Sequence, residues 1–369
     1  MTLRNDNEKN PTGEVINFIL KLFSQKKLDE VKKQIDKDLK KYPNSAILFN
    51  MLGVAYAQSK ETKNAEKNFR KAIEADSNYA QAYNNLGTLL YELKNLDEAI
   101  DYYEKAINLN KDFVEAIVNI GCAKRLLNKS NEAIEFFKKV IKLKPNHAEA
   151  YNFLGVAYYD IGNKEESLEN LKKAIKIKPD YAEAYNHLGV VLRKLTRFDE
   201  SLASYNKSIE LNPNKEEVYN NLGGLYNNLG KFNEATQAYK KAIEIKPDYA
   251  LTHSNLLFNI NCKQDFDPQE YLREAKNFRI NCKPKKKFSL NYNFEKNPTK
   301  LKLGLVSADF GNHPGGFFTL STLRELVKKN FELVAYCTQE RNDEFSHHFK
   351  PLFSRWHSVE KEKDEKIVE

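Results

Sequence analysis

Residues 182–215 read AEAYNHLGVVLRKLTRFDESLASYNKSIELNPNK, and this stretch decides the fold. Its Leu188-Gly189 pair recurs every 34 residues from Leu52-Gly53 to Leu222-Gly223, as Ile120-Gly121 in one of the six units. A small residue follows each glycine by twelve positions, as Ser201 does here. Small residues at helix crossings allow close packing, and one helix pair cannot bury its apolar face alone. The period therefore predicts helix pairs stacked into a solenoid.

The same pattern gives the boundaries of the array. It resembles the tetratricopeptide repeat (TPR), which has this period. Six full units cover residues 46–249, a degenerate unit that suits a capping role precedes them at 12–45, and a partial unit follows at 250–260. Aromatic residues at recurring positions are interpreted as core. We expect a mostly α protein, a right-handed α-solenoid over residues 12–260, followed by a small partial α/β (Rossmann-like) segment.

Composition excludes several other classes of protein. Hydrophobic residues make up 41% of the chain and charged residues 30%, which is typical of a soluble globular protein. No apolar run is long enough for a membrane helix, and the polar N-terminus lacks the apolar core of a signal peptide. The four cysteines show no metal-ligand spacing, so a reduced, cytoplasmic setting without metal fits best.

The net charge of +8 does not by itself indicate a nucleic-acid partner. The lysines are spread over helices that also carry aspartate and glutamate, which is typical of a solvated surface.

Asparagine recurs on the first helices of the repeats, although it is a poor residue for a helix interior. Two interpretations stay open. Because each amide offers both a donor and an acceptor, a row of them could pair with the main chain of an extended peptide. Alternatively, the amides could bond neighbouring repeats to one another. The candidate peptide-binding residues are Asn50, Asn84, Asn85, Asn119, Asn152, Asn186, Asn220, Asn221 and Asn255, with breaks at Met51, Phe153 and His187.

The last quarter of the chain has a different pattern. Residues 261–300 suggest a short helix at 268–280 and a linker with a basic cluster at 283–287, interpreted as a solvated linker rather than an anion site. Apolar runs at 301–307 and 331–337 predict strands, and 317–329 has helical periodicity. Strand, helix and strand together predict a parallel βαβ unit. A further helix is expected at 343–353 and a short third strand at 356–359.

The loop after the first predicted strand is the candidate for chemistry. It reads DFGNHPGG and contains Asp309, Gly311, Asn312, His313 and Pro314. Ligands of open α/β sheets bind beyond the carboxyl ends of the strands, where this loop would lie. His313 could exchange a proton near neutral pH, or could be a turn histidine bonded to backbone. The dinucleotide fingerprint GxGxxG is absent.

The stretch KLGLVSADFGNHPGGFF at 302–318, placed after a TPR array and a short linker, resembles the start of the catalytic region of protein O-GlcNAc transferases. The resemblance implies that His313 lines an active site near the donor sugar and the acceptor. It also implies that the repeats present protein substrates, with an asparagine ladder holding the peptide main chain. That role would fall on Asn85, Asn119, Asn221 and Asn255.

The resemblance implies a donor such as UDP-GlcNAc or another UDP- or GDP-sugar, held largely by a second lobe. From Leu301 to Glu369 there are only 69 residues, so we expect an incomplete catalytic lobe. We therefore expect residues 1–369 to bind extended peptides without transferring sugar, and no cofactor unless the chain continues. The alternative is a non-catalytic TPR adaptor. Pairing of two copies through the superhelix stays open.

Overall fold

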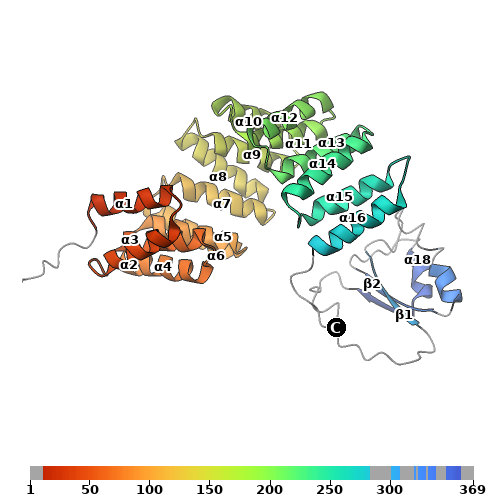
Figure 1. Cartoon of the computed structure of the whole chain (residues 1–369), viewed down its shortest axis with the longest axis horizontal. Coiled ribbons are helices and arrows are strands. Elements are labelled where there is room, and N and C mark those ends of the chain that lie inside the picture. Colours follow the sequence, from red (N-terminus) through yellow and green to blue (C-terminus); the bar gives the residue numbers. More distant parts are fainter. Residues whose placement is uncertain are drawn as a thin grey trace, which may run out of the picture. The chain divides into compact units, whose positions relative to one another are not determined.

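The computed structural model describes residues 11–282, 301–307, 320, 323–329, 331–337 and 346–358. The chain divides into two compact units, residues 1–284 and 285–369 (Figure 1). The first unit consists of helices, and the second contains the strands. In neither unit does a helix among the described residues have the length and apolar character needed to span a bilayer.

The helices of the first unit pair in sequence order, each first helix packing on the second helix that follows it. Every connection within a pair is a three-residue turn until the last pair. The pairs are α1 (Gly13–Ser24) with α2 (Leu28–Leu39), α3 (Ala46–Gln58) with α4 (Thr62–Ala75), α5 (Ala80–Glu92) with α6 (Leu96–Leu109), α7 (Val114–Leu126) with α8 (Ser130–Leu143), α9 (Ala148–Asp160) with α10 (Lys164–Ile177), α11 (Ala182–Lys194) with α12 (Phe198–Leu211), α13 (Glu216–Asn228) with α14 (Phe232–Ile245), and α15 (Ala250–Asn261) with α16 (Pro268–Asn281).

Close packing inside each pair depends on the recurring glycine. A methyl group built on Gly189 would lie 2.6 Å from the ring of Tyr205, and one on Gly53 would lie 2.5 Å from the ring of Phe69. The recurring small residues, such as Ser201 and Ala235, are fully buried at the same crossings. The sequence prediction that glycine and small residues mark helix crossings is therefore confirmed.

The three-residue turns share a backbone conformation that could not be predicted from their residue types. The middle residue of each turn has a positive φ, and these residues recur with the same 34-residue period as the glycines. Only two of them are glycine, which tolerates this conformation without strain. They are Lys26, Lys60, Lys94, Asn128, Gly162, Thr196 and Gly230.

The last helix of the first unit differs from the sequence prediction. The sequence pattern ends the array at residue 260 and assigns 261–300 to a helix and linker, whereas α16 packs on α15 within the first unit. The reason is local. Leu257 stands at the glycine position, and the connection 262–267 is twice as long as the earlier turns, so the repeat period is lost.

The second unit contains a parallel sheet in the order β1 (Leu301–Ser307), β2 (Phe331–Cys337), β3 (Arg355–Ser358). The register joins Leu301 to Phe331, and Cys337 pairs with both Ser307 and Ser358. Residues 323–328 are helical between the first two strands, and α18 (Ser346–Phe349) and the 3-10 turn η1 (Lys350–Leu352) precede β3. The predicted strands at 301–307 and 331–337 are confirmed.

Candidate functional site

One face of the repeat array is formed by the first helices of the pairs, and we call it the inner face. The first helices of neighbouring pairs contact each other along α3, α5, α7, α9, α11, α13 and α15, whereas neighbouring second helices meet less closely. The asparagines singled out from the sequence all lie on these first helices.

The asparagines form two rows rather than one. The members of the first row are buried between neighbouring first helices: Asn50, Asn84, Asn152, Asn186 and Asn220. The members of the second row are half-buried and occupy the next position along the helix: Asn85, Asn119, Asn221 and Asn255. The two rows therefore have different surroundings and different roles.

Hydrogen bonds join the two rows across each repeat boundary. In each of four rungs the Nδ2 of a half-buried asparagine donates to the Oδ1 of the buried asparagine 35 residues earlier. The distances are 2.9 Å from Asn85 to Asn50, 3.1 Å from Asn119 to Asn84, 3.0 Å from Asn221 to Asn186 and 2.9 Å from Asn255 to Asn220. The interpretation that the amides bond neighbouring repeats accounts for the buried row.

The same bonds determine which groups of the half-buried amides are available to a ligand. Each Nδ2 donates one N–H inside the wall, which leaves the acceptor Oδ1 and a second N–H of the amide for other partners. Asn85 Oδ1 accepts a 3.1 Å bond from Gln81, but among the described residues the Oδ1 atoms of Asn119, Asn221 and Asn255 accept none. The inner face thus presents a spaced set of hydrogen-bond acceptors.

The row is interrupted in the middle of the array. Phe153 replaces asparagine and stacks on Phe137 with ring centroids 5.7 Å apart. Its neighbour across the boundary is Val118, so no amide bond forms there. In the next repeat His187 takes the asparagine position, and its Nδ1 lies 2.8 Å from Asn152 Oδ1. Burial, with smaller contributions from Arg125 and Lys215, lowers the pKa of His187 to about 4.

The inner face carries a second column of side chains, which was not predicted from the sequence. Toward their carboxyl ends, four successive first helices carry tyrosine and arginine in alternation, at the 34-residue spacing. Arg125 Nε lies 3.2 Å from Asp160 Oδ2, whereas no carboxylate in the described part of the chain pairs with Arg193. The spacing was a usable signal for these residues, which are Tyr91, Arg125, Tyr159 and Arg193.

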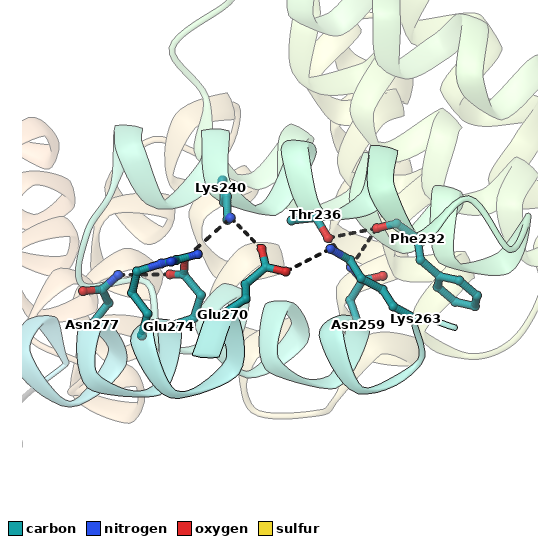
Figure 2. A network of polar contacts seen from close by, with 9 residues as sticks. Phe232, Thr236, Lys240, Asn259, Lys263, Glu270, Glu274 and Asn277 are labelled. Carbon is teal, nitrogen blue, oxygen red and sulfur yellow. Dashed lines mark hydrogen bonds and ion pairs between the residues drawn. The ribbon is translucent and has the colours of Figure 1, made fainter. Parts of the chain in front are cut away.

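Polar contacts attach α16 to the end of the array (Figure 2). Glu270 lies 2.9 Å from Lys240 of α14 and 3.2 Å from Lys263, and Glu274 lies 3.6 Å from Lys240. Asn259 of α15 donates to Thr236 at 2.7 Å and to the carbonyl of Phe232 at 2.9 Å. The charged groups pair with one another, and among the described residues only Asn259 Oδ1 of this cluster is buried without a hydrogen-bond partner, so we assign the cluster to packing rather than to ligand binding.

The candidate residues of the second unit lie outside the described residues. They are Asp309, Gly311, Asn312, His313 and Pro314. The strand that leads to them ends at Ser307, beside the ends of β2 and β3. Over the described ranges, no group of histidine, cysteine and acidic side chains could hold a metal ion.

Sequence profiles of known families match the helix pairs of the first unit from α3 to α14. Three described as tetratricopeptide repeat match residues 46–79, 80–113 and 180–248, and one described as TPR repeat matches 121–162 and 157–195. The helix pairs from α3 to α14 are tetratricopeptide repeats. No curated protein matches the sequence.

Solved TPR proteins resemble the array in fold. A TPR protein from Parabacteroides merdae is 17% identical with a TM-score of 0.58, covering 67% of this chain and 98% of its own. A chain of the APC/C hetero-tetramer Cut9-Hcn1 is 17% identical with a TM-score of 0.57, covering 75% of this chain and 54% of its own. At these identities the likeness concerns the fold, and a TPR fold does not specify a ligand.

Proposed function

We propose that the TPR array binds extended segments of other proteins along its inner face. The observation that carries the proposal is the half-buried row, in which Asn119, Asn221 and Asn255 each direct an amide donor into the wall and keep an acceptor oxygen. Main-chain N–H groups of an extended peptide need acceptors, and every non-proline residue supplies one. Such a row would hold peptides of many sequences.

The bonds within the wall also favour binding by reducing its entropic cost. A free asparagine side chain on a helix surface would lose rotamer freedom on contact with a peptide. Here the amide of Asn221 is already held at 3.0 Å from Asn186, so its acceptor is oriented before the ligand arrives. We infer that the structural and binding interpretations of the asparagines describe one arrangement.

The test uses the whole chain and fluorescently labelled neutral peptides of varied sequence. We expect Asn221→Ala with Asn255→Ala to weaken binding of all of them by about tenfold, since each lost bond is worth about 0.5–1.5 kcal/mol. Peptides with N-methylated main chains should bind weakly to the unchanged protein. The control is Asn228→Ala, because Asn228 is exposed at the end of α13. Equal affinity of all variants would contradict the proposal.

We also propose a more specific role, in which the array presents substrates to a protein O-GlcNAc transferase-like catalytic region. The resemblance of residues 302–318 supports it, and so does the parallel sheet that begins at Leu301. The test is transfer of labelled GlcNAc from its UDP donor to a Ser/Thr peptide by the protein purified from its own cells. Transfer that is lost in His313→Ala would support this role, and absence of transfer would favour a non-catalytic scaffold.

A further inference from the structure

Arg193 lies on the inner face with a charge that its surroundings do not neutralise. Its Nε is buried and has no hydrogen-bond partner among the described residues. Two arginines elsewhere in the array have carboxylate partners: Arg70 lies 2.8 Å from Glu66, and Arg197 lies 2.7 Å from Glu200. A guanidinium that is partly removed from water without a counter-ion is costly, so its position asks for a reason.

The guanidinium is held against the next repeat. Gly224 of α13 has no side chain, and a methyl group built there would lie 2.7 Å from Arg193 Nη1. Tyr205 interacts with the Arg193 guanidinium, and the Oη of Tyr205 and the Oδ1 of Asn227 are buried. The Arg193 charge opposes the burial that raises the pKa of Tyr205 to about 12. Among the described residues, therefore, no carboxylate forms an ion pair with Arg193, whose interaction with the Tyr205 hydroxyl is neutral.

The acidic residues of the same helices are too far away to pair with it. Glu183 on α11 and Glu217 on α13 lie in the first turns, ten residues before Arg193 and Asn227. At about 1.5 Å of rise per residue this separation is about 15 Å along the helix. The asparagine position of α11, by contrast, is His187, only about 9 Å from Arg193 by the same rise.

We propose that Arg193 receives an anionic side chain, a carboxylate or a phosphate, of the peptide held by the half-buried asparagine row. The inference rests on the proposed peptide binding and adds a side-chain preference to it. A guanidinium fork matches both groups in geometry and binds them with charge-assisted hydrogen bonds. Because successive residues of an extended peptide point to opposite sides, a peptide lying along the asparagine row directs alternate side chains toward Arg193.

A peptide fits this surface better than a nucleic acid does. Nucleic acids bind through several phosphates, each neutralised by lysine or arginine. Within the tyrosine and arginine column, Arg193 is the guanidinium that has no carboxylate partner among the described residues, and it stands beside a row of amide oxygens, which repel phosphate oxygens. The opposite edge of the inner face carries Glu183 and Glu217, which would repel a polyanion.

The experiment compares labelled peptides of equal length that differ at one residue, which is asparagine, aspartate or phosphoserine. That residue is moved through successive positions, and binding to the full chain is measured by fluorescence anisotropy. We expect one register in which an acidic peptide binds about tenfold more tightly than the asparagine peptide. The ratio should fall to about one in Arg193→Gln and persist in Arg125→Gln, whose arginine is paired with Asp160.

Gly224→Ala is a second variant that keeps the charge and displaces the guanidinium, so it should also lower the ratio. A preference for aspartate alone identifies a carboxylate ligand, and one for phosphoserine alone a phosphate. If acidic and neutral peptides bind equally, the role of Arg193 is refuted and the peptide-binding proposal survives. If no peptide binds, both fail. A single-stranded oligonucleotide that binds and is released by Arg193→Gln would also overturn the inference.

Discussion

At the residue scale, some turns between paired helices are strained, because a residue other than glycine has a positive φ there. Thr196 has φ of 58° in the turn between α11 and α12, and Gly230 has φ of 68° at the equivalent place 34 residues later. A left-handed backbone costs an ordinary residue about 1–2 kcal/mol, whereas glycine loses about 0.5–1 kcal/mol of unfolded-state entropy instead. At Thr196, whose side chain is β-branched, the cost of strain therefore exceeds the entropy that a glycine would lose.

We expect Thr196→Gly to raise the free energy of unfolding by about 0.5–1 kcal/mol, the difference between these two effects. Chemical denaturation followed by circular dichroism measures it. The reciprocal change, Gly230→Thr, provides the control and should lower stability by a similar amount. A stabilisation by Gly230→Thr would show that the turn backbone adapts and that the argument from φ is wrong.

His187 makes the stability of the array depend on pH. Burial, and then Arg125 and Lys215, lower its pKa to about 4, compared with about 6.5 in an unfolded chain. Between these values the unfolded state binds the proton and the folded state does not, so stability falls as the pH falls from 6.5 to 4. Below pH 4 both states are protonated and the loss is complete, on the order of 3 kcal/mol at most.

His187→Asn should remove this contribution, because asparagine can make the bond to Asn152 without titrating. The measurement is the difference in unfolding free energy between the variant and the unchanged protein from pH 7 to pH 4. Taking the difference removes the pH dependence that comes from the carboxylates, because both proteins share them. A difference that stays constant over this range would show that His187 is protonated normally in the folded protein.

At the element scale, α16 is held by charges as well as by packing. His253 of α15 stacks on Phe278 with ring centroids 5.2 Å apart, and Glu270 bridges Lys240 and Lys263 (Figure 2). The Glu270 side chain is only 16% exposed, so its ion pairs are little screened by solvent. Hydrogen bonding to Lys240, and then to Lys263, holds the pKa of Glu270 below its usual value.

We expect Glu270→Gln to loosen α16 by about 1–2 kcal/mol, because two lysines lose their shared partner. Hydrogen exchange should become faster in α16 and stay unchanged in α5 and α6. The depressed pKa gives the same effect a pH dependence: the contribution is present above about pH 4.5 and is lost as the pH falls through the lowered pKa. Glu244→Gln is the control, since its partner Lys241 is on the same helix and its side chain is 69% exposed. Equal exchange in both variants would contradict the assignment.

The helices and strands could be predicted from the sequence where their signal is local and repeated. Gly189 and Ser201 mark a crossing in the sequence as clearly as in the structure. The place of α16 was missed because Leu257 and a longer connection break the period, although the helix still finds partners by contact. The division of the asparagines into two rows was also missed, because Asn220 and Asn221 look alike until burial distinguishes them.

At the scale of the whole molecule, the binding row is only as continuous as the repeats that carry it. In a stacked array each repeat contacts its neighbours, so a defect in one repeat stays local. Val118 and Phe153 occupy a pair of positions that would otherwise form an amide hydrogen bond. The row is therefore interrupted between Asn119 and Asn221. We infer that a long peptide gains contacts at both ends of the row but none in the middle.

Restoring the missing rung should therefore improve binding of long peptides alone. The double variant Val118→Asn with Phe153→Asn supplies an acceptor and the amide that would bond to it, as Asn186 and Asn221 do. One added hydrogen bond, worth about 0.5–1.5 kcal/mol, should tighten binding of a neutral peptide that spans the array by about two- to tenfold. Loss of the Phe153 contact with Phe137 should lower the unfolding free energy by about 1–3 kcal/mol.

Two comparisons separate this gain from a general change in the surface. Phe153→Asn alone leaves its new amide opposite Val118 without a partner, so its acceptor is not oriented and affinity should stay unchanged. A short peptide that reaches only Asn221 and Asn255 should bind the double variant and the unchanged protein equally. If the single variant gains as much as the double, or the short peptide gains as much as the long one, the ladder does not act through oriented amides, and the inner face would bind by shape or charge instead.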